Sequence, residues 1–493
     1  MVTGYNGDFA YSNTGDPLVE FFSKSGSVLK RGKNRPYYGD NKPCEPMDLF
    51  IDAFATDELK AFKLAMWLRD CRGGAGVRGG FRDILVWLSI TYPSWVNANI
   101  HLVPLYGRWD DLIVLMGTTC EDTAIELWVD AIKKQDGLAC KWAPREKSDK
   151  ATFHKLRKKL KLSPGDFRKT ISTGTNVVET AMCNNDWSGI EYNHVPSVAM
   201  ARSFKAFSSH DEDRFASWKT SLADPESGNK INASVLFPHD CIRMLKKDLG
   251  QTEGYYGWSH SCNQGNEVFA DSELANAAFA ALPNFMGETD MRIISLCDFS
   301  YSMCTEVAGE ILAIDVSMAL GLYCSDRLGE DSPFYRKFIP FSTDSRLVDW
   351  NNDTFSVAAQ KYNDGFVGST NITAALDQIL DAATFLNATN DQIPNCLLIL
   401  SDMQWDTACS NGSSTAVEQS MVKWENAGYT RPRIVLWDLN PYDTSPATVD
   451  HKDTAMVSGF SPSILGAVLS GDDFTPRGVM EKAIQKYEVV DPR

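Results

Sequence analysis

The stretch that decides the fold of the C-terminal part is Ile293-Ile-Ser-Leu-Cys297, followed at once by Asp298-Phe-Ser300-Tyr-Ser302. A short apolar run that ends in polar residues is typical of a buried strand in a parallel sheet. The same succession returns at Cys396-Leu-Leu-Ile-Leu400, which leads into Ser401-Asp402. Two such strands, separated by helical patterns, predict a mostly parallel α/β sheet that helices cover on both faces.

The pattern around these two strands predicts further elements of the same sheet. Apolar residues at helical spacing predict helices over residues 307–325, 372–386 and 417–427. Short apolar runs predict strands over residues 338–341, 347–350 and 434–437. Because proline cannot donate a backbone hydrogen bond, Pro340 predicts an edge position for the first of these strands. The fold class expected from residue 291 onward is therefore a doubly wound α/β domain.

Three polar clusters are expected at the carboxyl ends of these strands, where open α/β sheets bind ligands. They are Asp298-Phe-Ser300-Tyr-Ser302, Gly368-Ser-Thr370-Asn371 and Ser401-Asp402. Carboxylate and hydroxyl oxygens are hard ligands, which suit Mg²⁺ or Mn²⁺ with water completing an octahedral shell. The predicted metal ligands are Asp298, Ser300, Ser302, Thr370 and Asp402.

Helix capping is the alternative interpretation of the same side chains. Ser and Asp are good N-caps, and Thr370 could cap the helix that follows it. The pattern Asp-x-Ser-x-Ser is also short enough to arise by chance. The conjunction favours a metal site, because each cluster lies at a strand end or a helix start within one α/β pattern.

This arrangement resembles the metal-ion-dependent adhesion site of von Willebrand factor A domains. The resemblance covers residues 291 to about 470 and implies that Ser300, Ser302 and Thr370 ligate directly. Asp298 and Asp402 would ligate directly or through water, and one position would remain for an acidic group of a protein partner. The third loop departs from the usual Asp-Gly form, because Met403 follows Asp402.

The organisation of the whole chain follows from its length and its charge. A chain of 493 residues predicts about three domains. Residues 1–46 predict an irregular arm, 47–250 a helical region, 251–290 a partly helical connection, and 291–493 the α/β domain with C-terminal helices. Residues 1–290 hold 34 Lys and Arg against 37 Asp and Glu, whereas residues 291–493 hold 14 against 27. Contact with a polyanion is therefore expected in the first part rather than the second.

Four markers in the helical region carry a family resemblance. The four markers are Arg69-Asp-Cys-Arg72-Gly-Gly-Ala-Gly76-Val-Arg78, Pro104-Leu-Tyr-Gly107-Arg108-Trp109-Asp110-Asp111-Leu112, Lys141-Trp-Ala-Pro144-Arg145-Glu146 and Val195-Pro-Ser-Val-Ala-Met200. Together they resemble domain-of-unknown-function family 2828, which is found in plants and large DNA viruses. That family is similar in layout to TROVE proteins, which place HEAT-like helix pairs before an A-type domain. The resemblance to TROVE proteins implies a helical region that binds small structured RNA.

The residues of the first two markers also have an interpretation of their own. Residues 74–79 fit the pattern GxGxxG, but they follow a helix, and a dinucleotide site needs a preceding strand. A corner between two helices is therefore expected there. Arg108-Trp109-Asp110-Asp111 predicts a capped helix start with an ion pair rather than a pair of catalytic carboxylates.

The most basic stretch of the chain lies in the helical region. It could contact phosphates, or it could be a solvated helix face, and the sequence favours neither. His154 beside it is expected to be a surface histidine. The candidate nucleic-acid-binding residues are Lys155, Arg157, Lys158, Lys159, Lys161, Arg168 and Lys169.

The sequence predicts a non-enzymatic binding scaffold. It contains no HExxH, P-loop or GxSxG motif, and no general base is recognisable beside the predicted metal. The alternative is a protein-interaction or structural component that binds no nucleic acid. The twelve cysteines follow no disulfide or zinc spacing, and the first residues lack an apolar core typical of a secretory signal. A cytoplasmic setting without a membrane partner is therefore expected.

Overall fold

The computed structural model divides into two compact units. One unit, called the α/β unit, contains residues 1–56 and 232–485, and the other, called the helical unit, contains residues 57–231 and 486–493. Each unit is described by itself. The residues that the structure describes are 2–3, 9–27, 45–175, 177–222, 224–233, 236–245, 272–287, 289–308, 311–363, 368–406, 415–442, 444–469 and 473–493.

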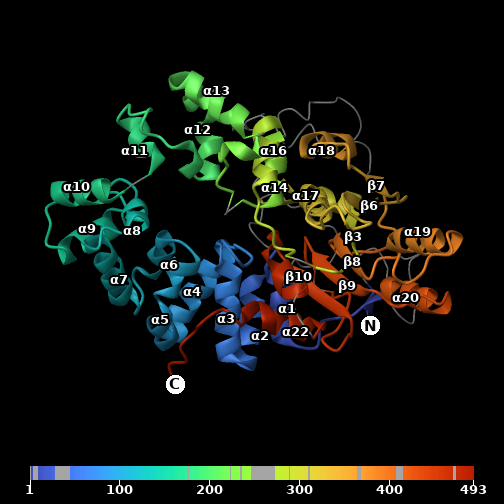
Figure 1. Cartoon of the computed structure of the whole chain (residues 1–493). Coiled ribbons are helices and arrows are strands. Elements are labelled where there is room, and N and C mark those ends of the chain that lie inside the picture. Colours follow the sequence, from blue (N-terminus) through green and yellow to red (C-terminus); the bar gives the residue numbers. More distant parts are fainter. Residues whose placement is uncertain are drawn as a thin grey trace. The chain divides into compact units, whose positions relative to one another are not determined.

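A six-stranded sheet forms the centre of the α/β unit (Figure 1). The strand order is β10-β9-β8-β3-β6-β7, and all neighbours pair in parallel except β6 and β7. The strands are β3 (Ile293–Asp298), β6 (Lys337–Phe341), β7 (Val348–Asp349), β8 (Cys396–Ser401), β9 (Arg433–Asp438) and β10 (Thr454–Ser458). Every residue of β3, β8 and β10 is buried, as expected for parallel strands covered on two faces.

The direction in which the chain adds strands reverses at the centre of this sheet. From β3 the chain passes to β6 and β7 on one side, and it then returns to β8, β9 and β10 on the other side. Right-handed crossovers place helix α17 (Ala313–Asp326), which follows β3, on one face of the sheet. They place α20 (Ala416–Asn426), which follows β8, on the opposite face, where it packs on α19 (Ile372–Phe385). The reversal point lies between β3 and β8, the strands that end in Asp298 and Ser401.

The predicted strands and helices of this sheet are confirmed, with two differences. The helix predicted from residue 307 begins only at Ala313, because β4 (Glu306–Ala308) and β5 (Ile311–Leu312) pair in antiparallel fashion before it. Strand β6 is not the edge strand. However, the pairing of β6 with β7 stops at Phe338, so at Pro340 the strand pairs with β3 alone. The missing N–H of Pro340 therefore removes no backbone hydrogen bond to β7.

The N-terminal residues belong to the α/β unit and not to a separate arm. Strands β1 (Val2–Thr3) and β2 (Phe9–Ala10) pair with each other, and α1 (Pro17–Ser25) packs against β10 and α2 (Pro46–Thr56). Asp16 caps α1, because its side chain accepts from the amides of Leu18 and Val19. The compact units therefore depart from the predicted boundary at residue 46.

The remaining elements of the α/β unit surround its sheet. These elements are α14 (Pro238–Leu245), α16 (Ser272–Ala280), η4 (Tyr301–Cys304), α18 (Phe355–Asn363), η6 (Pro462–Ile464), α21 (Leu465–Leu469) and α22 (Pro476–Ile484). The predicted connection over residues 251–290 falls largely outside the described residues, and its described part contains α16.

The helical unit is built from short helices, as predicted for this region. Successive helices pack on one another, as α4 does on α5, α7 on α8 and α12 on α13. They are α3 (Glu58–Arg69), α4 (Gly79–Thr91), α5 (Pro93–Asn99), α6 (Leu102–Tyr106), η1 (Trp109–Leu115), α7 (Glu121–Lys133), α8 (Gly137–Trp142), α9 (Lys150–Lys159), α10 (Pro164–Gly174), α11 (Val178–Cys183), η2 (Tyr192–His194), α12 (Ser197–His210), α13 (Glu212–Ser221) and η3 (Pro225–Ser227).

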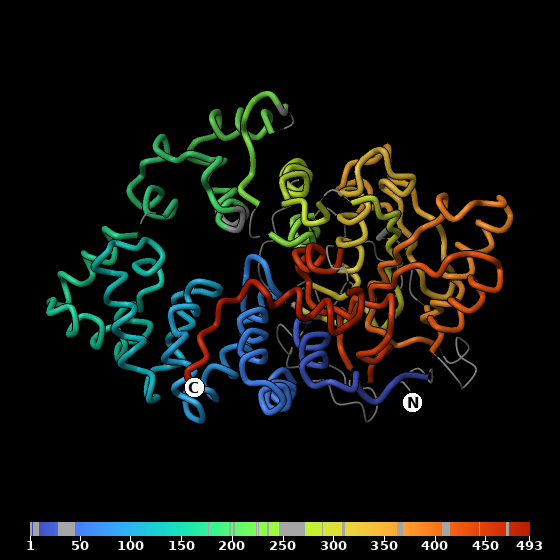
Figure 2. Tube along the Cα trace, turned by 60° about the horizontal axis from the view of Figure 1, so that its bottom comes forward, coloured from blue at the N-terminus to red at the C-terminus, as the bar shows by residue number. Residues whose placement is uncertain are grey.

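The C-terminal segment 486–493 completes the helical unit. Figure 2 shows this red segment beside the blue stretch that contains α3 to α6. The Tyr487 hydroxyl donates to Asp70 Oδ2 at 2.9 Å, and Lys486 Nζ lies 3.0 Å from the same oxygen. The Asn99 side chain exchanges two hydrogen bonds of 2.8 Å with the backbone of Val490.

Within the described ranges, every helix is too short or too polar to cross a lipid bilayer.

Candidate functional site

The predicted strand-end site forms at the reversal point of the α/β sheet. Strands β3 and β8 are parallel neighbours, and Cys297 pairs with Leu400, so Asp298 and Ser401 end the two strands at one level. The Ser401 hydroxyl donates a hydrogen bond to Asp298 Oδ2. The sheet therefore brings the first and third predicted clusters together.

Backbone hydrogen bonds attach the second cluster to the other two. The Tyr301 amide donates to the carbonyl of Gly368 at 3.3 Å, and the Asp406 amide donates to the carbonyl of Thr370 at 3.0 Å. Within the first cluster, the Ser300 amide donates to Asp298 Oδ1 at 2.8 Å, and the hydroxyls of Ser300 and Ser302 lie 3.1 Å apart. The five predicted ligands thus come from three loops that contact one another.

Two carboxyl groups are buried in this strand-end site with little to neutralise them. Asp298 and Asp402 are both inaccessible to solvent. Burial raises the pKa of Asp298 to about 6, although hydrogen bonds from Ser300 and Ser401 oppose the shift. Burial raises the pKa of Asp402 well above its usual value, and the negative charge of Asp298 raises it further. Like charges that share a buried site disfavour ionisation, so this pair is stabilised by whatever brings positive charge.

One oxygen of the strand-end site has no hydrogen-bond partner among the described residues. Asp402 Oδ2 is buried and makes no hydrogen bond, whereas the amide of Gln404 donates to Oδ1 at 3.3 Å. A buried carboxylate oxygen without a partner is costly, and a hard cation satisfies it directly. Among the described residues no group of three or more His, Cys, Asp and Glu could hold a metal, so a cation here would need the hydroxyls as well.

The N-cap of the helix after Thr370 is its neighbour Asn371. Asn371 is the N-cap of α19, and its side chain accepts from the Ala374 amide at 3.0 Å. Ser300 precedes η4 but makes no side-chain capping hydrogen bond. Ser300 and Thr370 are both buried residues at the strand ends.

Met403 stands where the resemblance expects glycine, and its backbone conformation suits glycine. Its backbone lies in the left-handed region at φ 59°, a conformation that glycine adopts more easily than other residues. The Met403 amide donates to the Ser401 hydroxyl at 3.1 Å. This bond helps to hold the side chain of Ser401 beside Asp298, so the carboxylates keep their places despite the substitution.

Two residues of this region were not predicted as part of the site. Ser401 orients Asp298, and Asp438 adds negative charge that contributes to the raised pKa of Asp402. Asp438 ends β9, the strand next to β8. A signal for it was present in the sequence, because Asp438 follows the apolar run 434–437 just as Asp298 and Asp402 follow theirs.

The basic stretch on α9 and α10 is less available to a polyanion than its composition suggests. Lys155 pairs with Glu121 at 2.6 Å, Lys159 with Glu126 at 2.8 Å, and Arg168 with Glu146 at 2.7 Å. Arg157 donates to His154 Nδ1 at 2.9 Å. Of the seven candidate residues, three are exposed and have no carboxylate partner within the described part of the chain, namely Lys158, Lys161 and Lys169.

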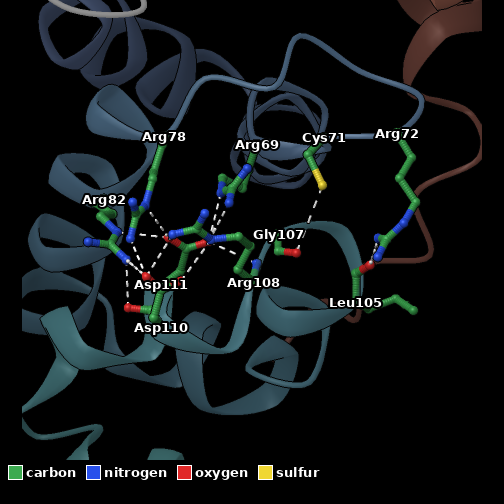
Figure 3. Close-up of polar contacts among 10 residues, drawn as sticks. All are labelled: Arg69, Cys71, Arg72, Arg78, Arg82, Leu105, Gly107, Arg108, Asp110 and Asp111. Atoms are coloured by element: carbon green, nitrogen blue, oxygen red, sulfur yellow. Dashed lines mark hydrogen bonds and ion pairs between the residues drawn. The ribbon is translucent and has the colours of Figure 1, made fainter. Parts of the chain in front are cut away.

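The first two markers of the helical unit meet in a cluster of arginines (Figure 3). At its centre Asp111 is fully buried and accepts from Arg69 Nε at 2.7 Å, from Arg82 Nε at 2.8 Å and from the Arg108 amide at 2.9 Å. Arg69 is itself buried. The predicted ion pair at residues 108–111 is thus confirmed as part of a larger network.

The outer part of this cluster gathers around Asp110. Oδ2 of Asp110 accepts from Arg108 at 2.8 Å and contacts the guanidinium groups of Arg78 and Arg82. Arg78 and Arg82 come from the start of α4, and Arg108 precedes η1. The outer arginines therefore converge on one carboxylate from two elements.

Arg72 and Asp70 face a different side of the same corner. Figure 3 shows Arg72 apart from the cluster, where it donates to the Leu105 carbonyl at 3.0 Å. An open groove of about 850 Å³ lies there within the helical unit, lined among others by Asp70, Arg72 and Tyr106.

Two family models match different parts of the chain. Residues 123–274 match the family model described as Domain of unknown function (DUF2828), which confirms the predicted family resemblance over that range. Residues 292–491 match a second model, Domain of unknown function (DUF7788), which covers the strands and helices of the sheet.

Two similar proteins span nearly the whole chain. An uncharacterized protein of Acanthamoeba polyphaga mimivirus is 23% identical over 544 aligned positions, which cover 99% of this chain and 87% of the relative. A crystal structure of the Ro protein of Deinococcus radiodurans aligns with a TM-score of 0.49 and 13% identity, over 96% of this chain and 99% of that one.

Proposed function

We propose that this chain, whose two parts match families of unknown function, is a non-enzymatic binding scaffold with a von Willebrand factor A-type domain. Support comes from the strand order of the sheet, which reverses between β3 and β8 and has one antiparallel edge strand. The five predicted ligands lie at that reversal point, where doubly wound sheets bind ligands. The domain would use a metal-dependent adhesion site to dock a protein partner.

The residues at the reversal point fit a hard cation. Asp298, Ser300, Ser302, Thr370 and Asp402 would hold Mg²⁺, or Mn²⁺, which would supply positive charge to a domain that is otherwise acidic. The observation that carries this proposal is the buried, unpartnered Oδ2 of Asp402 beside a second buried carboxyl group. Both carboxylates would be committed to the cation, so neither would be free to act as a general base.

The partner would present an acidic side chain. Residues 291–493 carry 14 Lys and Arg against 27 Asp and Glu, so an acidic partner would be repelled by the domain without the cation. A cation held at the strand ends would reverse that repulsion locally. A cytoplasmic setting remains a prediction from the sequence.

We expect partner capture by the immobilised chain to depend on Mg²⁺. Proteins bound in Mg²⁺ should elute with EDTA and rebind when Mg²⁺ is restored, because chelation removes the charge that holds the acidic group. Mass spectrometry of the eluates checks this result, followed by Asp→Asn and Glu→Gln substitutions in each captured partner.

Two variants control the capture experiment. Asp402→Asn should lose the EDTA-eluted proteins, whereas Asp377→Asn should keep them, since Asp377 pairs with Lys423 on the surface of α19 and α20. Identical captured proteins with and without EDTA would rule out metal-dependent docking.

RNA binding by the helical unit is a second candidate function. The observation that favours it is that Lys158, Lys161 and Lys169 are exposed on α9, on α10 and on the loop between them, with no carboxylate partner among the described residues. Three lysines without partners form a modest basic surface, which suits contact with phosphates rather than base recognition.

We expect the triple variant K158Q/K161Q/K169Q to weaken binding of a structured RNA and to flatten its salt dependence. Loss of three phosphate contacts reduces the slope of log K against log salt by about 2 to 3. Gel shifts between 50 and 200 mM KCl measure that slope. The matched variant K155Q/K159Q, whose lysines already pair with glutamates, should change it much less. Absence of any RNA shift at low salt would leave the chain as a protein-binding scaffold alone.

A further inference from the structure

The outer arginines of the cluster in Figure 3 carry more positive charge than the protein neutralises. Among the described residues, two carboxylates pair with Arg69, Arg78, Arg82 and Arg108, namely Asp110 and Asp111. A cluster held by ion pairs alone is neutral when its positive and negative groups are equal in number. Here four guanidinium groups meet two carboxylates, which leaves two positive charges without a counter-charge.

The excess charge lies on the accessible side of the network. The inner pair of Arg69 and Asp111 is buried, whereas the side chains of Arg78, Arg108 and Arg82 are 41%, 33% and 24% exposed. Each outer arginine uses its Nε and Nη2 atoms on Asp110 or Asp111. No hydrogen bond within the described residues involves the Nη1 atoms of these three side chains, so each keeps donors for a further acceptor.

Burial and the neighbouring arginines both lower the pKa of Arg78. Partial burial lowers the pKa of Arg78, and the positive charges of Arg108 and Arg82 lower it further against the opposing effect of Asp110 and Asp111. Burial has the largest effect on this pKa, and the neighbouring arginines act in the same direction. An added anion would relieve the repulsion among these arginines.

Two neighbouring features also favour an anion. Arg78 is the N-cap residue of α4, a helix of 13 residues that has no side-chain cap, so its positive end adds to the charge of the arginines. The guanidinium of Arg108 lies 4.0 Å from the centre of the Trp142 ring, which holds it flat beside the cluster. The positive groups are thus fixed in place before an anion arrives.

We propose that Arg78, Arg82 and Arg108 form a binding site for a phosphate group beside Asp110. The forked donors of arginine match phosphate oxygens in pairs. A phosphate monoester or inorganic phosphate carries nearly the two negative charges that the cluster lacks, whereas a carboxylate carries one. The site lies in the helical unit and does not depend on the proposed cation site.

Titration calorimetry with inorganic phosphate tests this proposal on the full chain. We expect saturable binding of phosphate, and no heat from potassium chloride at the same ionic strength. Arg78→Gln and Arg108→Gln should each weaken phosphate binding about tenfold or more, because each removes charge-assisted hydrogen bonds. Arg78→Lys keeps the charge and loses the fork, so it should lie between Arg78→Gln and the unchanged chain.

A matched control separates the site from general positive charge. Arg168 is an exposed arginine of the same unit that pairs with one carboxylate, Glu146, so Arg168→Gln should leave phosphate binding within about twofold. Circular dichroism melting without phosphate shows whether each variant remains folded. The proposal is overturned if the unchanged chain shows no saturable phosphate binding. It is also overturned if the folded R78Q/R108Q variant binds phosphate as tightly as the unchanged chain.

A competition experiment distinguishes the two sources of a phosphate group. If a single-stranded uridine decamer displaces inorganic phosphate, the forked arginine donors rather than the double charge select the ligand, and its source is the singly charged backbone of a nucleic acid. If the decamer does not compete, the site holds free phosphate or a small phosphomonoester. The lysine variant K158Q/K161Q/K169Q should retain phosphate binding. That result would show that the arginine site is separate from the lysines proposed to bind RNA, whether or not those lysines bind it.

Discussion

Asp402→Asn is expected to raise the melting temperature of the metal-free chain and to abolish its stabilisation by Mg²⁺. Asp298 and Asp402 are buried together, and Asp402 Oδ2 makes no hydrogen bond to any residue that the structure describes. Replacing one carboxylate with an amide of the same shape removes like-charge repulsion from a buried site. The same substitution removes an anionic ligand, so a cation has little left to bind. A purely structural role for Asp402 does not predict these opposite effects.

Thermal unfolding with and without Mg²⁺ measures both halves of this result. For the unchanged chain, Mg²⁺ at about 100 times its dissociation constant should stabilise the folded state by about 2.7 kcal/mol. For Asp402→Asn the two melting curves should coincide. Asp377→Asn, a surface carboxylate on α19, should keep the full Mg²⁺ response. Equal Mg²⁺ responses in Asp402→Asn and the unchanged chain would remove Asp402 from the cation site.

Asp111→Ala is expected to destabilise the helical unit by about 3–5 kcal/mol. Asp111 is fully buried and faces Arg69, whose side chain is only 3% exposed. Removal of the carboxylate leaves a buried guanidinium without a counter-charge, which is far worse than loss of an exposed ion pair. The same change also removes the acceptor of the Arg108 amide. Urea unfolding followed by circular dichroism measures the loss.

Asp130→Ala provides the matched control for this prediction. Asp130 forms an exposed pair with Lys133 on α7, so its loss should cost less than about 1 kcal/mol. A comparable loss in both variants would show that burial of the arginine network does not determine its contribution.

The pH dependence of Asp111→Ala gives an independent check. Burial raises the pKa of Asp111, but Arg69, Arg82 and the Arg108 amide together bring it below its ordinary value. A carboxyl group whose folded pKa is lowered contributes stability above its unfolded pKa, and that contribution is lost as the pH falls through the folded value. The difference in stability between the unchanged chain and Asp111→Ala should therefore narrow below about pH 4. A difference that stays constant down to pH 2 would contradict the charge-based account.

The sheet was largely predictable because parallel strands bury both faces and are therefore apolar throughout. Few structures other than a buried strand fit short apolar runs such as residues 293–297 and 396–400, and these runs correspond to β3 and β8. Strand β10 was missed, since Thr454 and Ser458 at its ends weaken its apolar signal. The hairpin of β4 and β5 was predicted as helix, because short paired segments have no period of their own to detect.

The strand-end cluster was predictable for the same reason as its strands. Where adjacent parallel strands end, the residues that follow them must lie close together, so Asp298 and Asp402 could be paired from sequence. The chemistry between them could not be read in this way. The unpartnered oxygen of Asp402 and the bond from Ser401 to Asp298 depend on side-chain positions that no spacing specifies.

The arginine cluster shows where local patterns stop being informative. Arg108-Trp109-Asp110-Asp111 predicted an ion pair, and the pair exists, but its partners Arg69 and Arg82 lie in other helices. Helical periodicity shows which face of a helix is apolar. It does not show which charged side chain of another helix pairs with the charged residues of this one. For the same reason the ion pairs that occupy Lys155, Lys159 and Arg168 could not be expected from the basic stretch alone.

The discontinuous helical unit has a consequence for biosynthesis. Residues 57–231 leave the ribosome well before Lys486 and Tyr487, and residues 232–485 are made in between. At about 5–20 residues per second, that interval lasts on the order of 10 to 50 seconds. Throughout it Asp70 lacks both side chains that pair with its Oδ2 atom, and Asn99 lacks Val490. The nascent helical unit must therefore remain soluble in an incomplete form, which makes this interval the period in which a chaperone would act on the chain.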